Sequence, residues 1–458
     1  METVSGGILI EISPGETRAA IIDDNGRLVE LLIERMDRPA LEGGIHLGRV
    51  TRVEASLNGA FVALADGQDG FLRRSKGLHE GQSVLVQVTR EASGGKGPTL
   101  SDRLSIVGRY LALTPMRSDV TYSARLGNGR RRAQLEALMS RLQVDEGLAL
   151  RAAAVDAEDD DIVAELARLR AGWSDLQDAA AAQDAPVRLT PPPDLIARVL
   201  RDQKAGQVVI DDPLAFRKAE ALAGAHIPGW RGLLQRHDDA TPLFESYGFA
   251  EEVEAVCERT VILPDGIRLT IDPLEALTAI DVDSGAGGRR TADDAILRVN
   301  RAALGEVARQ VRLRNLSGLI VVDFLNMRRK TVRSEFLQAA RRAFRGDSTQ
   351  VDVMGLTAAG LLELTRRRIA PPLHELLTAR PSARPTVAAS ACAALRAVLR
   401  LTGAGRPVLV AAPEIIDLLE GPLAAARADV DRRMGQPVTL RADKTARHWD
   451  AMLEKGEG

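Results

Sequence analysis

Three aspartates end two short apolar segments of the chain. Asp281 and Asp283 close residues 277–283, and Asp323 closes residues 318–323. A buried strand that stops on an acid carries the carboxylate to the edge of its sheet, and side chains two apart point to the same side. Clustered carboxylates repel one another unless a cation joins them, and their oxygens suit Mg²⁺ or Mn²⁺. The spacing therefore predicts a metal site.

The residues around these acids are strongly basic. Residues 286–346 contain fourteen Arg plus Lys and five Asp plus Glu, in a chain whose formal charge is −2. Mg²⁺ held by one or two carboxylates and by substrate phosphates is common in phosphoryl-transfer sites. The pattern favours a polyanionic substrate, and the alternative is a solvated basic face.

An amphipathic helix is expected between the two segments. Leu304, Val307, Ala308 and Val311 keep the spacing of one helical face. A strand-helix-strand unit brings the ends of two neighbouring parallel strands to one sheet edge, which would place Asp323 near Asp281 and Asp283. The calcium-loop alternative requires Glu at its twelfth position, where this chain has Ala292.

Three ungapped runs resemble the catalytic core of the ribonuclease E/G family of bacterial endoribonucleases. They are EALTAIDVDSG (275–285), ARQVRLRNLSGLIVVDFLNM (308–327) and GLLELTRRRIAPPL (360–373). The resemblance implies that Asp281 and Asp323 bind Mg²⁺, with Mn²⁺ as a substitute. Asp283 stands where the family usually has Asn, and Ala358-Ala359-Gly360 stands where it has Arg-Phe-Gly.

The first hundred residues are expected to form strands. Residues 8–12, 18–22 and 28–33 are apolar runs separated by turn residues, and short strands at regular spacing follow from residue 45 to about residue 104, as in a five-stranded barrel. The second set resembles an S1-type OB-fold. By that resemblance Phe61 and Phe71 stack on bases and Lys96 contacts RNA, whereas from the residues alone both phenylalanines could equally be barrel core.

Residues 105–186 are expected to be mainly helical, with a loop at 126–132 and a helix beginning in the acidic stretch 156–161. In the resembling family an Arg-Thr pair holds the 5′-monophosphate of RNA. The matching residues here are Arg151 and Ala152. Arg151 keeps the guanidinium group, which can bind phosphate through two hydrogen bonds, but Ala152 lacks the hydroxyl of Thr. We therefore expect only a weak preference for RNA with a 5′-monophosphate.

The last part of the chain is expected to be a small α/β domain. Helices at 388–401 and 413–419 flank a strand at 407–411, after a proline-containing linker at 378–385. The family's longer members share one zinc between two chains through a CPxC motif in this linker. Here the linker has no Cys, and Cys257 and Cys392 form no CxxC pattern. We therefore expect no zinc, and any homodimer would rest on other contacts.

The expected fold class is α/β, as an α+β multidomain chain of 458 residues. With the resemblance, it divides into N-terminal strands of an RNase H-like subdomain (1–40), an S1-like OB-fold (41–105), a helical region that senses the 5′ end (106–190), the rest of the RNase H-like subdomain (191–270), a DNase I-like catalytic subdomain (271–377) and the linker with the small C-terminal domain (378–458).

No apolar run approaches the roughly twenty residues needed to span a membrane, and the N-terminus has no signal-peptide pattern, so a cytoplasmic location is expected.

The leading hypothesis is a Mg²⁺-dependent endoribonuclease that cleaves single-stranded RNA in RNA processing, RNA decay or rRNA maturation. The alternative is a homologue that binds RNA but cleaves weakly or not at all, acting as an RNA chaperone or ribosome-maturation factor. The two departures, at Asp283 and at Ala358-Ala359, favour this alternative. A metal-dependent transferase using the Asp-x-Asp pattern is a third hypothesis, but it leaves the barrel unexplained.

Overall fold

The computed structural model describes residues 4–92, 97–204, 206–230, 232–264, 266–285, 293–379, 384–446 and 449–454. The chain forms two compact units. The first comprises Met1–Arg38, Gln207–Asp212 and Arg236–Gly458, and the second comprises Pro39–Gly206 and Pro213–Gln235. Each unit is described by itself.

The first unit begins with a sheet that joins distant parts of the chain. The predicted strands β1 (Ile8–Ser13), β2 (Glu16–Ile22) and β3 (Leu28–Arg35) are confirmed, and they form an antiparallel meander. β14 (Val208–Ile210) pairs parallel to β1, and β15 (Leu234–Arg236) completes the order β15-β14-β1-β2-β3. The short helices α5 (Leu243–Ser246) and α6 (Ala250–Glu254) contribute Phe244 and Val253 to its core.

A six-stranded sheet of the same unit carries the predicted aspartates. Its order is β16-β17-β18-β19-β21-β20, and only β18 and β19 are parallel among the strand pairs of the described sheet. The strands are β16 (Thr260–Ile262), β17 (Arg268–Pro273), β18 (Thr278–Asp283), β19 (Gly318–Asp323), β20 (Val351–Leu356) and β21 (Leu362–Arg366).

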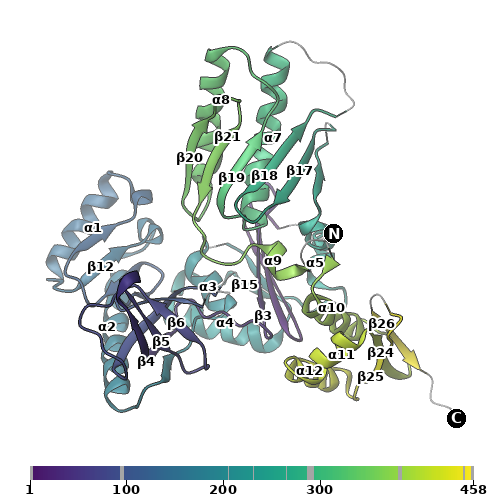
Figure 1. Cartoon of the computed structure of the whole chain (residues 1–458), viewed down its shortest axis with the longest axis horizontal. Coiled ribbons are helices and arrows are strands. Elements are labelled where there is room, and N and C mark those ends of the chain that lie inside the picture. The colour runs from purple at the N-terminus through teal and green to yellow at the C-terminus, as the bar shows by residue number, and fades with distance from the viewer. Residues whose placement is uncertain are drawn as a thin grey trace. The chain divides into compact units, whose positions relative to one another are not determined.

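Two helices cover one face of this sheet (Figure 1): α7 (Asp293–Leu313), which connects β18 to β19, and α8 (Lys330–Ala343). Leu304, Val307 and Val311 of α7 are buried in one core with Phe336 of α8 and Ile320 of β19. The predicted strand-helix-strand unit is therefore confirmed, because the apolar stripe of α7 packs onto the sheet.

The C-terminal part of the first unit follows α9 (Leu373–Leu377) and the short pair β22 (Thr378–Ala379) and β23 (Arg384–Pro385). It contains α10 (Val387–Leu399), β24 (Arg406–Ala411), α11 (Pro413–Glu420), α12 (Ala424–Met434), β25 (Thr439–Ala442) and β26 (Trp449–Glu454). The strand order is β25-β24-β26. The predicted helix-strand-helix order is confirmed, and Cys392 is buried in this core.

The second unit contains a closed barrel. Strands run in the order β4-β5-β6-β8-β7, and a further β4–β7 pairing closes the ring, which is consistent with an OB-fold. β13 (Val187–Thr190) extends β4 outside the ring. The ring consists of β4 (Ile45–Glu54), β5 (Gly59–Ala63), β6 (Asp69–Leu72), β7 (Ser83–Arg90) and β8 (Thr99–Ser101).

The segment expected to be mainly helical is instead mixed. It contains the sheet β11-β12-β10-β9 together with α1 (Arg130–Arg141) and α2 (Asp159–Ala181). These strands have two to four residues, which is too short for an alternating pattern to stand out: β9 (Ile106–Val107), β10 (Leu111–Thr114), β11 (Val120–Tyr122) and β12 (Gly147–Leu150). The acidic helix start is confirmed, since three aspartates form the first turn of α2.

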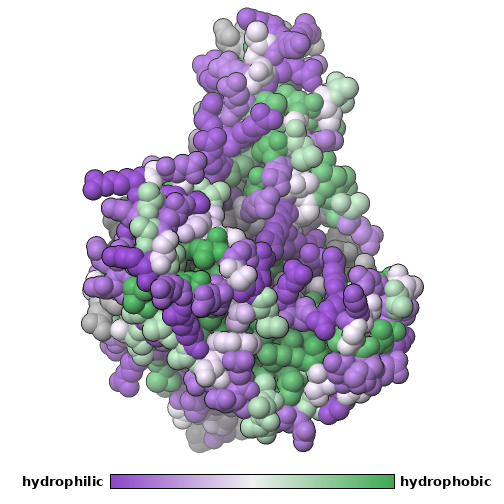
Figure 2. Space-filling model, turned by 90° about the vertical axis from the view of Figure 1, so that its left-hand side faces the viewer, coloured by the Kyte–Doolittle hydropathy of each residue, from purple (hydrophilic) through white to green (hydrophobic). Residues whose placement is uncertain are grey.

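The helices α3 (Leu195–Asp202) and α4 (Pro213–His226) complete the second unit. Within the described parts of the chain, no helix is long and apolar enough to cross a membrane. The face drawn in Figure 2 is mostly hydrophilic, with hydrophobic side chains in separate patches.

Candidate active site

Asp281 and Asp323 lie directly opposite each other at the ends of β18 and β19. They are register partners in the parallel pair, and both side chains are exposed. The residues beside them, Ile280, Val282 and Val322, are buried against the helices. Because side chains alternate along a strand, burying these apolar residues turns both carboxylates to the open face of the sheet.

Asp283 is held toward the neighbouring strand β17 and not toward β19. Its Oδ2 accepts a hydrogen bond from Nη2 of Arg268 at 2.7 Å, and its Oδ1 accepts one from the backbone N–H of Gly285 at 3.0 Å. Arg268 is the cross-strand partner of Asp283 on β17, and in the sheet order β17 and β19 flank β18. The structure therefore brings Asp281 and Asp323 together and pairs Asp283 with a cation.

Two opposed carboxylates fit a magnesium ion. Mg²⁺ favours hard oxygen ligands and usually keeps several waters, so one or two protein carboxylates suffice when substrate phosphates complete its shell. In the described segments, no three His, Cys, Asp or Glu residues are grouped closely enough to hold a metal ion together. Asp281 and Asp323 are thus the residues that would hold the ion, and both are accessible to a phosphate.

The loop after β19 is fixed by a residue that sequence reasoning missed. Asn300 of α7 is fully buried; its Nδ2 donates to the Leu325 carbonyl at 2.8 Å, and its Oδ1 accepts from the Leu325 N–H at 3.0 Å. This two-point contact holds the backbone just after Asp323. The signal in the sequence was a polar residue in the apolar stripe that continues through Leu304, Val307 and Val311.

The turn between β20 and β21 reaches the same edge of the sheet. Val322 pairs with Leu362, so the turn before Leu362 lies at the end of the sheet that carries Asp323. Ala358 and Ala359 are exposed in this turn. The family's Arg-Phe-Gly pattern is therefore lost at a position close to the candidate site.

Part of the basic charge predicted to face the substrate has a structural role. Arg309 binds Glu306 and Glu252 and donates to the carbonyl of Leu28, and Arg312 binds Glu30 of β3. These contacts dock α7 onto the N-terminal sheet. Other exposed cations lie in the loop after β19 (Arg328), at the start of α8 (Lys330) and near the end of α8 (Arg341, Arg342, Arg345), whereas Arg289 and Arg290 lie outside the described residues.

Phe61 and Phe71 meet on the surface of the barrel rather than in its core. Their ring centroids are 5.4 Å apart in an edge-to-face arrangement, and both side chains are partly exposed. The guanidinium of Arg52 lies 4.6 Å from the centre of the Phe61 ring. The buried barrel core is made of aliphatic residues such as Val62 and Leu72. Stacking on bases remains a prediction, and Lys96 lies outside the described residues.

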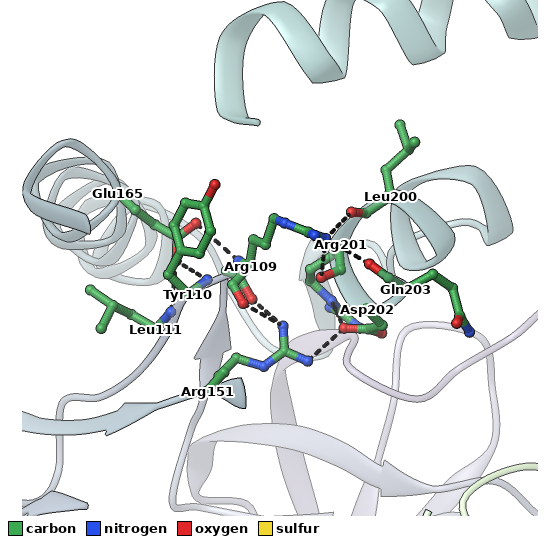
Figure 3. Close-up of polar contacts among 10 residues, drawn as sticks. Arg109, Tyr110, Leu111, Arg151, Glu165, Leu200, Arg201, Asp202 and Gln203 are labelled. Carbon is green, nitrogen blue, oxygen red and sulfur yellow. Dashed lines mark hydrogen bonds and ion pairs between the residues drawn. The ribbon is translucent and has the colours of Figure 1, made fainter. Parts of the chain in front are cut away.

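Arg151 is surrounded by acceptors from its own chain (Figure 3). It donates to the carbonyls of Gly108 and, at 3.3 Å, Arg109, and its Nη2 lies 2.6 Å from Oδ1 of Asp202. Asp202 also binds Arg201 through two contacts of 2.8 and 2.7 Å. Burial alone would raise the pKa of the Asp202 carboxyl, but the hydrogen bonds and charges of the two arginines lower it overall. A phosphate at Arg151 would compete with this ionised carboxylate.

The neighbouring backbone is fixed by a buried acid. Glu165 of α2 accepts hydrogen bonds from the N–H groups of Arg109, Tyr110 and Leu111 at 2.9, 2.7 and 2.7 Å (Figure 3). Residues 126–132 were expected to form a loop, but α1 begins at Arg130, and two arginines of its first turn are also engaged: Arg131 pairs with Asp159 and Arg132 with Glu136.

Comparison with known proteins gives a consistent assignment. The profile of the Ribonuclease E/G family matches residues 105–369. Ribonuclease E of Haemophilus influenzae is 32% identical over 386 residues, which is 79% of this chain and 41% of that protein, so the chain spans less than half of that relative. Ribonuclease G of Escherichia coli K12 is 28% identical over 473 residues, covering 95% of this chain and 96% of the relative. The chain therefore belongs to the ribonuclease E/G family of endoribonucleases.

Proposed function

We propose that the protein is a Mg²⁺-dependent endoribonuclease that cleaves single-stranded RNA. The observation that carries the proposal is the opposed pair Asp281 and Asp323 on the open ends of two parallel strands. Bound there, the ion would activate water and offset negative charge on the phosphate. The family relatives named ribonuclease E and ribonuclease G support the substrate class.

Some residues of the site would bind the ion or the phosphate, and others would keep the binding residues in position. Asp281 and Asp323 would hold the ion, and the Asn300 contact keeps the backbone that follows Asp323 in place. Arg328, exposed in the next loop, and Lys330, exposed at the start of α8, would be available to phosphate oxygens. These groups would bring the scissile phosphate to the carboxylate pair.

RNA affinity would come mainly from the barrel of the second unit. The partly exposed rings of Phe61 and Phe71, with Arg52 beside them, offer a surface on which bases of any identity can stack. We also assign RNA contact to Lys96 on the family resemblance. Arg151 would contribute to a 5′-end site only by exchanging Asp202 for phosphate.

The domain scheme predicted from the sequence is part of the proposal. The sheet containing β1 and β14 would be the RNase H-like subdomain, and the sheet containing β18 and β19 the DNase I-like subdomain. We further propose a cytoplasmic protein that binds no structural zinc, so that any homodimer rests on other contacts. The linker lacks Cys, and Cys392 is buried, with burial raising the pKa of its thiol to about 12.

A second function has specific support. An RNA chaperone or ribosome-maturation factor without efficient cleavage would retain the barrel but could lose groups at the sheet edge. Ala358 and Ala359 are exposed at that edge, and Asp283 is occupied by Arg268.

Cleavage of an end-labelled oligonucleotide separates these functions. The proposal expects internal cuts in single-stranded RNA with Mg²⁺, no cuts when EDTA removes the ion, and little cutting of a duplex of the same sequence. Binding without cuts at any Mg²⁺ concentration would favour the chaperone function.

A further inference from the structure

Asp283 brings a third negative charge close to the proposed metal site. It lies two residues from Asp281 on the same strand, so its side chain faces the same side of the sheet as Asp281 and as Asp323, the register partner of Asp281. A free third carboxylate would repel an incoming phosphate and would offer the cation a further oxygen ligand. Two charges a few ångströms apart interact strongly enough, even near a protein surface, for this carboxylate to affect phosphate binding.

The structure places the positive charge of Arg268 directly opposite Asp283 on the neighbouring strand. Arg268 and Asp283 are cross-strand partners, joined at 2.7 Å, with 53% and 44% of their side-chain surfaces exposed. The backbone around the pair leaves little freedom. Gly285 has a φ of +70°, and a Cβ added there would lie 2.1 Å from the carbonyl oxygen of Gly266. The turn after Asp283 is therefore packed against the turn before Arg268.

We infer that Arg268 is a positioning residue of the active site that acts through Asp283. It holds the Asp283 carboxylate toward β17, outside the ligand set of the cation, and cancels its charge, so that Asp281 and Asp323 alone bind the metal. This inference rests on the proposed function. It also accounts for Asp283 at a position where the family usually has Asn, because the Arg268–Asp283 pair, like an amide, carries no net charge.

If Arg268 acts through Asp283, substituting Arg268 should strengthen metal binding and slow RNA cleavage. In Arg268→Gln the freed Asp283 carboxylate gains access to the cation, so Mn²⁺ should bind several-fold more tightly in the absence of RNA. The added negative charge opposes the phosphate, so kcat/KM for RNA cleavage should fall by about tenfold. Adding Asp283→Asn to Arg268→Gln removes the uncompensated charge and should return both values to within about threefold of wild type.

The matched control is a second Arg–Asp pair, whose acid lies on β17. Arg259 binds Asp272 through contacts of 2.5 and 2.8 Å, with 66% and 37% of their side-chain surfaces exposed. In the strand register Asp272 lies opposite Ala279 and not opposite an acid. Arg259→Gln should therefore leave both Mn²⁺ affinity and cleavage unchanged.

The experiment measures Mn²⁺ affinity by titration calorimetry and cleavage by initial rates on one labelled RNA, for wild type and these variants. Tighter Mn²⁺ binding with slower cleavage in Arg268→Gln, both reversed in the double variant, would support the inference. A cleavage defect that persists in the double variant, with Mn²⁺ affinity unchanged throughout, would overturn it. A wild-type protein that cuts no RNA would refute the proposed function, while the Mn²⁺ titrations would still decide the role of Arg268.

Discussion

Arg151 already has the partners that a phosphate would require it to give up. Asp202 and two backbone carbonyls engage its guanidinium, and Ala152 supplies no hydroxyl. We expect 5′-monophosphorylated RNA to be cleaved only a few-fold faster than the same RNA with a 5′-hydroxyl, because one lost hydrogen bond to a charged group costs about 1.5 to 3 kcal/mol. Initial rates on the two oligonucleotides test this. A large preference that disappears in Arg151→Ala would show that phosphate displaces Asp202.

The phenylalanine pair should affect binding and not folding. Phe61→Ala with Phe71→Ala should weaken RNA binding by at most a few kcal/mol, since each stacked base contributes about 1 to 3 kcal/mol. Both rings are partly exposed and lie outside the barrel core, so the melting temperature should change little. Fluorescence anisotropy with labelled RNA measures the affinity. A double variant that unfolds would instead show that the rings hold the barrel together.

At the scale of single residues, the sequence predicted which residues are candidates for the site better than it predicted the contacts that they make. The sequence predicted that the ends of two parallel strands bring Asp323 near Asp281, and the two are register partners in the structure. It also predicted that Asp283 joins them, but the ion pair with Arg268 depends on the register of β17 against β18, which local pattern does not define. Asn300 was overlooked because one polar residue does not interrupt a helical stripe.

Among the structural elements, β21 is tied to the segment after α8 by a buried ion pair. Arg366 and Asp347 have side chains only 2% and 4% exposed, and Nε of Arg366 donates to Asp347 at 2.8 Å. Arg366 also binds Asn315 at 2.7 Å. Arg366→Met deprives the buried Asp347 carboxylate of the cation that binds it, so this substitution should lower the free energy of unfolding by about 3 to 5 kcal/mol.

Urea denaturation followed by circular dichroism measures this change. The matched control is Arg367→Met at the adjacent exposed position, for which we expect a difference below about 0.5 kcal/mol. Equal effects of the two substitutions would mean that the buried pair contributes no more than a surface arginine.

Elements with long periodic patterns were predictable, and short or distant ones were not. The stripe of α7 and the acids of α2 identified both helices. The strands at 106–150 have at most four residues, and β1 pairs with β14 about 200 residues further along, so neither feature leaves a local pattern. Both the short strands and the pairing of β1 with β14 depend on contacts between segments that are distant in the sequence.

At the scale of the whole molecule, stability should depend on the protonation of Asp211. Its Oδ1 accepts the N–H of Ile12 at 2.8 Å, and burial raises the pKa of the carboxyl from 3.8 to about 7. Between these values the folded chain keeps a proton that the unfolded chain has lost. The stability contributed by this group is therefore full below pH 3.8 and is lost as the pH rises through 7.

Asp211→Asn keeps an acceptor for Ile12 and removes the titration. We expect the variant to be more stable than wild type at pH 8 by up to about 4 kcal/mol, with little difference at pH 4. Thermal or urea unfolding at the two pH values measures this, and Asp239→Asn at an exposed position serves as the control. A variant less stable than wild type at pH 8 would indicate that the ionised carboxylate stabilises the fold.

The central claim is that Asp281 and Asp323 form the metal site of an endoribonuclease, and the most direct test compares cleavage with affinity in the same variants. Asp281→Asn and Asp323→Asn should each abolish Mg²⁺-dependent cleavage of a labelled single-stranded RNA, because the ion loses a ligand. RNA affinity should stay nearly unchanged, since we expect it to come from the barrel and from basic side chains. Cleavage by both variants at the wild-type rate would contradict the assignment.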